Sequence, residues 1–142
     1  AFVMGHEIAH AVAQHGNERM SQQLTAVAGG MALDMYMAQK PAETRKLFNT
    51  AYGLGTQVGV MLPFSRIHES EADKLGMIFM ALGGYDPRPT PEIWKRMSAA
   101  GGGSVPELLS THPSDANRAA EMRKFMPEAM KYYNSSQNVK NK

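Results

Sequence analysis

Two histidines and a glutamate near the start of the chain have the spacing of a metal site. The segment His6-Glu7-x-x-His10 lies in residues 1–13, where every other residue is apolar or glycine. Positions four apart share one face of a helix, so His6 and His10 point the same way and can bind one zinc ion. Glu7 lies on the adjacent face and can take a proton from a water molecule. This pattern predicts zinc-dependent hydrolysis of peptide bonds.

A later segment offers the third ligand that a catalytic zinc ion needs. Glu69 and Asp73 are four residues apart and share a helix face. We expect Glu69 to bind the metal and Asp73 to accept the free ring N–H of a ligating histidine. Glu71 faces elsewhere, and we interpret His68 as a surface or hydrogen-bonding histidine.

Three motifs then occur in the order known from one family. They are Gly5 to His10, Ser65-Arg66 followed by Glu69 to Gly76, and Thr111-His112-Pro113 with Arg118. Together they resemble the gluzincin metallopeptidases of the HtpX and CAAX-prenyl-protease type. Within that family the sequence is most similar to soluble envelope members such as BepA and LoiP and to the mitochondrial Oma type. The resemblance extends from Ala1 to about Met126.

The resemblance implies a role for each matching residue. It makes His6, His10 and Glu69 the zinc ligands, Glu7 the catalytic base and Asp73 a support for the ligands. It also relates His112 to a family histidine that stabilises the transition state or occupies the open position of the zinc ion, and Arg118 to the arginine that accompanies it. From the residues alone, His112 is equally a turn or surface residue before a proline, and Arg118 a solvated helix residue.

The family further implies a substrate class and a location. Its members act on peptides or on unfolded and misassembled proteins of the cell envelope, which suggests a periplasmic or membrane-associated protein. Members carry strands before the motif helix, so we expect this sequence to be a fragment that lacks its N-terminal strands. Membrane association would come through that missing part. The residues predict no oligomeric state.

Composition narrows the remaining function classes. The chain has 142 residues and a formal net charge of +2, which is too small to indicate a nucleic-acid partner. It has no cysteine, which excludes a cysteine nucleophile and a thiolate metal site. Its 12 methionines indicate either adaptable core packing or a groove for varied apolar substrates.

The pattern of apolar residues predicts a mainly α protein with no convincing strand. We expect helices over residues 1–14, 18–39, 42–61, 67–82, 91–99 and 114–125, with a last turn reaching residue 133. Gly16 should provide a left-handed helix end, Pro63 should end the third helix, the pair Gly83-Gly84 should end the fourth, and Pro127 should break the sixth. The predicted metallopeptidase domain covers residues 1–133, and residues 134–142 should form a disordered polar tail.

Three other functions are compatible with the same residues. The first is an exopeptidase with the same zinc chemistry, although no acidic cluster for a free amine is evident. The second is a zinc-stabilised helical scaffold or chaperone-like binder with latent activity. The third is an anchor or docking module, which the apolar stretch Leu47–Phe64 favours.

Overall fold

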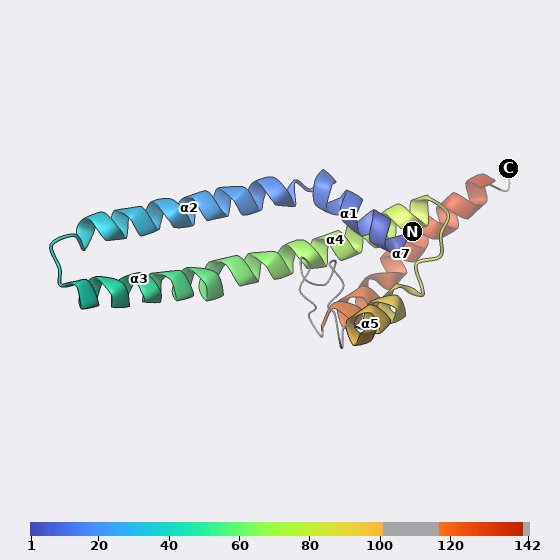
Figure 1. The fold of residues 1–142 in the computed structure, drawn as a ribbon. Coiled ribbons are helices and arrows are strands. Elements are labelled where there is room, and N and C mark those ends of the chain that lie inside the picture. The colour runs from blue at the N-terminus through green and yellow to red at the C-terminus, as the bar shows by residue number, and fades with distance from the viewer. Residues whose placement is uncertain (101–116, 141–142) are drawn as a thin grey trace. The chain divides into compact units, whose positions relative to one another are not determined.

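All regular structure in the described residues, 1–100 and 117–140 of a computed structural model, is helical (Figure 1). The prediction of a mainly α protein is therefore confirmed. In chain order the elements are α1 (Phe2–Val12), α2 (His15–Tyr36), α3 (Ala42–Thr56), the π-helical segment η1 (Gln57–Met61), α4 (Leu62–Leu82), α5 (Thr90–Ala100) and α7 (Arg118–Lys140).

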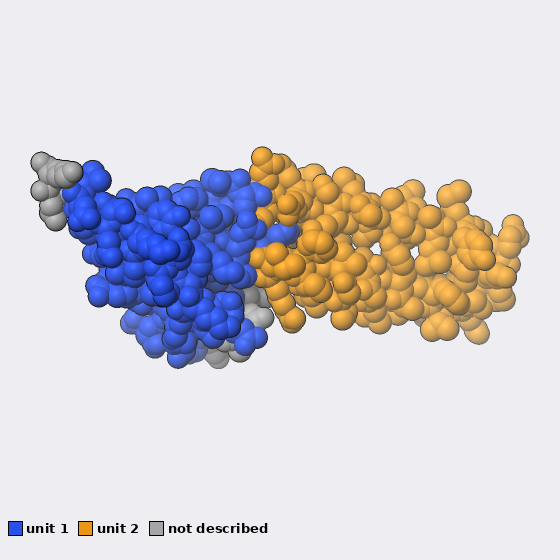
Figure 2. Space-filling model, turned by 180° about the vertical axis from the view of Figure 1, so that it is seen from behind, with its two compact units in different colours: residues 1–13, 68–142 blue, residues 14–67 orange. Residues whose placement is uncertain are grey.

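The chain divides into two compact units, coloured separately in Figure 2. The first contains Ala1–Ala13 and His68–Lys142, and we call it the motif unit because it holds the residues singled out above. The second contains Gln14–Ile67, and we call it the hairpin unit. The assignment of residues 1–133 to one metallopeptidase domain stays a prediction.

The core of the motif unit is built from four helices that are far apart in the sequence. Its buried apolar side chains come from α1, α4, α5 and α7, and they are Phe2, Met77, Met80, Trp94, Met122 and Ala129. Three of the six are methionines, so in this unit methionine does serve as adaptable core packing. The core ties α1 to α4 and so holds the two predicted ligand segments together.

Helix α4 ends at the predicted glycine pair. Gly84 has a φ of 85°, in the left-handed region that glycine adopts without strain. The amide of Gly84 donates to the carbonyl of Ala81, and the amide of Tyr85 donates to that of Met80. These two bonds form the Schellman arrangement that commonly ends a helix.

The hairpin unit consists largely of α2 and α3, which run antiparallel and lie side by side (Figure 1). The Tyr52 hydroxyl of α3 donates a hydrogen bond to the Ala26 carbonyl of α2 over 2.8 Å. The ring of Tyr52 lies over Gly29 and Gly30, and a Cβ at Gly29 would overlap its hydroxyl. The glycine pair therefore gives α3 room to approach α2.

The break between α1 and α2 lies earlier than predicted. Helix α1 ends at Val12, and Gln14 takes the left-handed conformation with a φ of 57°, whereas Gly16 already lies in the first turn of α2. A non-glycine residue in this region is strained and persists only where its surroundings hold it. The prediction from Gly16 therefore named the wrong residue, because the chain changes direction at Gln14, two positions earlier.

Pro63 does not end a helix, contrary to prediction. It lies in the first turn of α4, directly after the π-helical segment η1. In a regular α-helix the proline ring would clash with the carbonyl four residues earlier, which belongs to Gly59. The wider π turn moves that carbonyl away and allows the helical path to continue.

The C-terminal segment is also more ordered than predicted. Helix α7 passes through Pro127 and continues to Lys140, so the expected disordered tail over residues 134–142 is wrong as far as Lys140. The hydroxyl of Ser136 donates to the Ala81 carbonyl over 2.8 Å, and the amide of Gln137 donates to the Gly84 carbonyl over 3.2 Å. These bonds anchor the polar end of α7 to the end of α4.

Candidate metal centre

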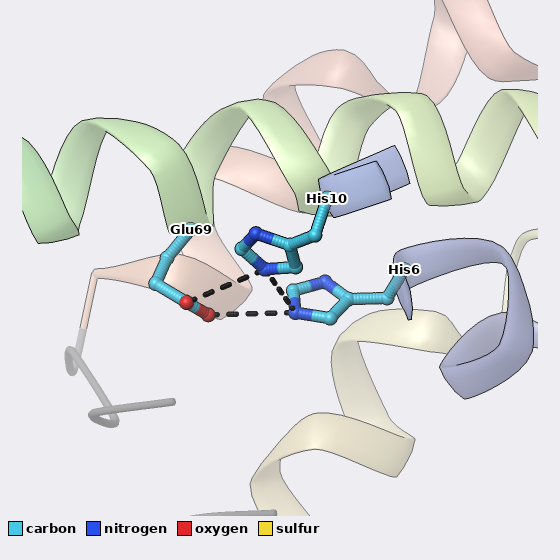
Figure 3. A group of neighbouring side chains, drawn as sticks. All are labelled: His6, His10 and Glu69. Atoms are coloured by element: carbon cyan, nitrogen blue, oxygen red, sulfur yellow. Dashed lines mark hydrogen bonds and ion pairs between the residues drawn. The ribbon is translucent and has the colours of Figure 1, made fainter. Parts of the chain in front are cut away.

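The structure brings His6, His10 and Glu69 together in the motif unit (Figure 3). The Nε2 atoms of His6 and His10 are 3.1 Å apart. Each is 3.4 Å from an oxygen of Glu69, His6 from Oε2 and His10 from Oε1. Helix α1 supplies both imidazoles from adjacent turns, and α4 supplies the carboxylate.

These three residues could hold a tetrahedral metal ion. With metal–nitrogen and metal–oxygen bonds of about 2.0–2.2 Å, donor atoms at two corners of a tetrahedron lie roughly 3.3 Å apart. The separation of the two Nε2 atoms, 3.1 Å, lies close to that value, whereas the two 3.4 Å separations run to different oxygens of Glu69. With one ligand atom from each residue, the three atoms lie within 4.8 Å of one another. Two imidazole nitrogens and one carboxylate oxygen also form a ligand set that zinc commonly uses. The residues therefore fit a zinc ion with one coordination position open.

Asp73 lies behind His6. Its Oδ1 is 3.1 Å from the Nδ1 of His6, on the side of the ring opposite Nε2. A carboxylate at Nδ1 favours the tautomer that leaves Nε2 available to a metal, and it fixes the orientation of the ring. Asp73 can therefore support the ligand without touching the metal.

Arg118 lies among the carboxylates of this cluster and is buried. Its Nε and Nη2 each donate to one oxygen of Asp73 over 2.7 Å, and its Nη1 is 2.8 Å from Oε2 of Glu69. A bidentate pair of this kind sets the geometry of the carboxylate as well as offsetting its charge. The guanidinium thus holds both Glu69 and Asp73, whereas the sequence suggested a partner of His112.

Sequence reasoning missed one residue of the cluster, Trp94 of α5. The guanidinium carbon of Arg118 lies 3.7 Å from the centre of the indole ring, within the range of a cation–π contact. The ring centroids of Trp94 and His6 are 6.4 Å apart. The only signal in the sequence was that Trp94 is the single tryptophan of the chain, which indicates no particular role.

The remaining predicted residues are placed differently. Glu7 follows His6 on α1 and is exposed, which allows it to meet a substrate or a water molecule. His68 is only 8% exposed, so it is not a surface residue, and its interpretation as a hydrogen-bonding histidine stays a prediction. His112 lies outside the described residues, and its role stays a prediction.

The three side chains of the cluster differ in their exposure to solvent. The side chain of His10 is 18% exposed, against 3% for His6 and 7% for Glu69. The protein interior closes the site behind His6, where Asp73 lies. Water or a substrate would therefore reach the cluster from the side of His10.

The charges around His6 favour its protonated form while no metal is bound. Burial alone lowers the pKa of His6, but its interactions with Asp73 and Glu69 outweigh burial and raise the pKa from 6.5 to about 9. The cluster therefore stabilises positive charge at the place where the metal would bind. This is expected of a site built from two carboxylates around one imidazole.

Comparisons with known proteins identify relatives of this chain. The sequence is 36% identical over 139 residues to the mitochondrial metalloendopeptidase OMA1 of Arabidopsis thaliana, covering 96% of this chain and 27% of that protein. It is 35% identical over 137 residues to the human mitochondrial metalloendopeptidase OMA1, covering 92% of this chain and 26% of that protein. It is 32% identical over 130 residues to the beta-barrel assembly-enhancing protease of Escherichia coli, covering 87% of this chain and 26% of that protein.

The chain spans about a quarter of the length of these three relatives. No solved structure gives a significant match to it. The model of peptidase family M48 matches residues 1–126, which include the histidine pair, Glu69 and Arg118. The chain therefore belongs to peptidase family M48.

Proposed function

We propose that this chain is the catalytic part of a zinc-dependent endopeptidase. The observation that carries the proposal is that His6, His10 and Glu69 each offer one ligand atom within 4.8 Å of the others. A zinc ion held there would polarise the scissile carbonyl and make a water molecule a stronger nucleophile near neutral pH. The relatives named as metalloendopeptidases support internal cleavage of peptide chains.

In this proposal Glu7 acts as the general base and then as the general acid. Its carboxylate takes the proton of the attacking water and delivers it to the leaving amine. His6 and His10 stay neutral while they bind the metal, and Asp73 holds the Nδ1 proton of His6. His112 would donate to the oxyanion that forms on the carbonyl carbon. Arg118 would keep Glu69 in place.

We further propose that the substrates are unfolded or misassembled proteins of a cell envelope or an organelle membrane. One relative is named for enhancing the assembly of beta-barrels, and others are named mitochondrial metalloendopeptidases. The name of the first relative, which refers to protein assembly, is compatible with this substrate class. The exposed edge of the site at His10 is compatible with an extended peptide.

Two measurements on the same preparations test the function. The first is the zinc content of the purified chain and of a His10→Ala variant, determined by mass spectrometry. The second is the chelator-sensitive digestion of casein that carries a fluorescent label. Glu7→Gln should keep its zinc and lose at least roughly 100-fold in rate, because general-base catalysis typically contributes that much.

The matched control is Glu43→Gln, which changes an exposed carboxylate at the start of α3 and should leave both values unchanged. Normal turnover by Glu7→Gln would refute the role of Glu7. Zinc bound without any digestion would favour the latent scaffold. Release of single terminal residues from a peptide with free ends, with no cleavage of a blocked peptide, would identify an exopeptidase.

A further inference from the structure

The two oxygens of Glu69 have different neighbours in the metal centre. Figure 3 shows each oxygen facing a different histidine, Oε1 at 3.4 Å from Nε2 of His10 and Oε2 at 3.4 Å from Nε2 of His6. Oε2 also lies 2.8 Å from Nη1 of Arg118. An oxygen that accepts a charge-assisted hydrogen bond has less electron density to offer to a second cation. The two oxygens of Glu69 are therefore not equivalent as metal ligands.

The guanidinium of Arg118 connects both arms of the site. Its Nε and Nη2 each donate to an oxygen of Asp73 over 2.7 Å, while Nη1 contacts Glu69. Oδ1 of Asp73 in turn lies 3.1 Å from Nδ1 of His6. These contacts lie at the edges of a planar group, so they fix its position within its own plane. A tilt out of that plane is restricted only by what covers its faces.

Trp94 covers one face of this guanidinium. The guanidinium carbon of Arg118 lies 3.7 Å from the centre of the indole ring, and Trp94 is only 3% exposed. Tryptophan offers the strongest aromatic face for a cation, and the contact gains strength where water is excluded. The indole N–H makes no hydrogen bond to the described residues 1–100 and 117–140. Within this part of the chain, Trp94 therefore contacts the cluster through the face of its ring.

The position of the ring is fixed by the core of the motif unit. Trp94 of α5 is buried in one cluster with Phe2 of α1, Met77 of α4 and Met122 of α7. A close-packed core leaves such a ring little freedom to change its orientation. A divalent cation at the site would repel the guanidinium, since both are positive. The indole face offsets that repulsion and keeps Arg118 in contact with the two carboxylates.

We propose that Trp94 is a positioning residue of the metal centre. It holds Arg118 on Oε2 of Glu69, so that Glu69 binds the metal through Oε1 alone. The inference rests on the zinc-dependent function proposed above. Two imidazole nitrogens and one carboxylate oxygen leave the fourth tetrahedral position open to a water molecule. A carboxylate bound through both oxygens would add a fifth ligand atom and crowd that position.

The zinc affinity of three variants tests this role, measured by competition with a zinc chelator. Trp94→Leu removes the aromatic face and should lose roughly tenfold in affinity, the lower end of the range for groups that orient a metal ligand. Trp94→Phe keeps an aromatic face and should recover most of that loss. The matched control is Met80→Ala, which truncates another side chain of the same core. It should lower the melting temperature and leave zinc affinity unchanged.

Cobalt in place of zinc reports on the coordination itself. Four-coordinate Co²⁺ absorbs visible light much more strongly than five-coordinate Co²⁺, so the band distinguishes a carboxylate bound through one oxygen from one bound through both. The absorption per bound ion should weaken in Trp94→Leu. It should stay near the value of the unmodified chain in Trp94→Phe and in Met80→Ala. A ring that only fills space in the core would leave the band unchanged in all three variants.

Nuclear magnetic resonance of the metal-free chain follows the contact between the two side chains. The ring current of Trp94 should shift the signal of the Arg118 Nε–H proton, and its bond to Asp73 should slow its exchange with water. In Trp94→Leu the shift should vanish and the exchange should become faster. Circular dichroism should show that every variant keeps its helix content.

Two results would overturn the inference. The first is a Trp94→Leu variant whose zinc affinity or cobalt band matches that of the unmodified chain. The second is a folded Trp94→Phe variant that loses as much affinity as Trp94→Leu, since the aromatic face would then not be what matters. An unmodified chain that binds neither metal refutes the proposed function as well. Zinc binding and casein digestion by the unmodified chain, with Trp94→Leu unaffected, would remove only the role of Trp94.

Discussion

Gly5 of α1 and Gly76 of α4 lie in backbone contact where these two helices cross. A Cβ on Gly5 would lie 2.7 Å from the carbonyl oxygen of Gly76, and a Cβ on Gly76 would lie 2.9 Å from the amide nitrogen of His6. Any side chain at either position would meet backbone that cannot rotate away. This crossing places His6 one residue from the contact and brings α1 close enough for its imidazoles to reach Glu69.

We expect Gly76→Ala to weaken both the fold and the metal centre. The added methyl group must push α1 away from α4, which costs about 1–3 kcal/mol as overpacking usually does. Displacement of His6 should lower zinc affinity as well. Thermal unfolding and a competition assay with a zinc chelator measure the two effects.

Gly55→Ala is the control for that substitution. Gly55 also lies in a helix, but nothing lies within 4 Å of a Cβ built on it. Alanine there should stabilise α3 by about 0.5–1 kcal/mol, because glycine is a poor helix former. Zinc affinity should not change. Equal zinc affinity in Gly76→Ala and the unmodified chain would show that the close crossing is not needed for the site.

Arg118→Lys should lower zinc affinity although it keeps the positive charge. Lysine cannot make the two parallel bonds that Arg118 makes to Asp73 while also reaching Glu69. Loss of a residue that orients a metal ligand typically costs roughly 10- to 100-fold in metal affinity. Arg123→Lys, at an exposed position on the same helix, should have no effect. An unchanged zinc affinity in Arg118→Lys would mean that charge alone suffices.

Trp94 and Arg118 should be energetically coupled. The indole face lies against the guanidinium inside the protein, where such contacts contribute about 1–2 kcal/mol. In a double-mutant cycle of Trp94→Leu and Arg118→Met, the loss in the double variant should be smaller than the sum of the single losses. Unfolding in urea provides the free energies, and it is followed by circular dichroism because the two variants that carry Trp94→Leu lack tryptophan. Additive losses would show that the ring only fills space.

The metal centre could be predicted from sequence to the extent that it depends on helix geometry. The four-residue spacings of His6 with His10 and of Glu69 with Asp73 convert directly into shared helix faces. The contacts of Arg118 with Asp73 join residues 45 positions apart, and Trp94 has no spacing relationship to any ligand. Such contacts arise from the packing of α5 and α7 on α4, which no local pattern encodes.

A helix end could be predicted where a single residue determines the backbone conformation. Gly84 ends α4 as expected, because the left-handed conformation needs a residue without a Cβ. Pro63 and Gln14 were not predictable, since each depends on how neighbouring backbone adapts. A π turn accommodates the proline, and Gln14 takes a left-handed conformation although its side chain disfavours it.

The stability of the metal-free motif unit should fall as the pH rises from about 6.5 to about 9. Burial opposes protonation of His6, but Asp73 and Glu69 raise its pKa to about 9 in the folded chain, against 6.5 as the ordinary value. The folded state thus binds the proton more tightly than the unfolded state does. The resulting stabilisation is fully present below pH ~6.5 and is lost as the pH passes through the folded pKa. The stabilisation amounts to about 3 kcal/mol, because a shift of one pKa unit corresponds to 1.36 kcal/mol.

Urea unfolding of the chelator-treated chain at pH 6, 7.5 and 9 measures this loss. The fluorescence of Trp94 reports on the motif unit alone, because Trp94 is the single tryptophan and lies in that unit. The variant His6→Asn keeps a polar side chain but cannot take up the proton, so its stability should depend much less on pH. With zinc present, the stability should instead rise with pH. His6 must release its proton to bind the metal, so the affinity for zinc increases as the pH rises. A stability that stays constant between pH 6.5 and 9 in the metal-free chain would contradict the tight pairing of His6 with the two carboxylates.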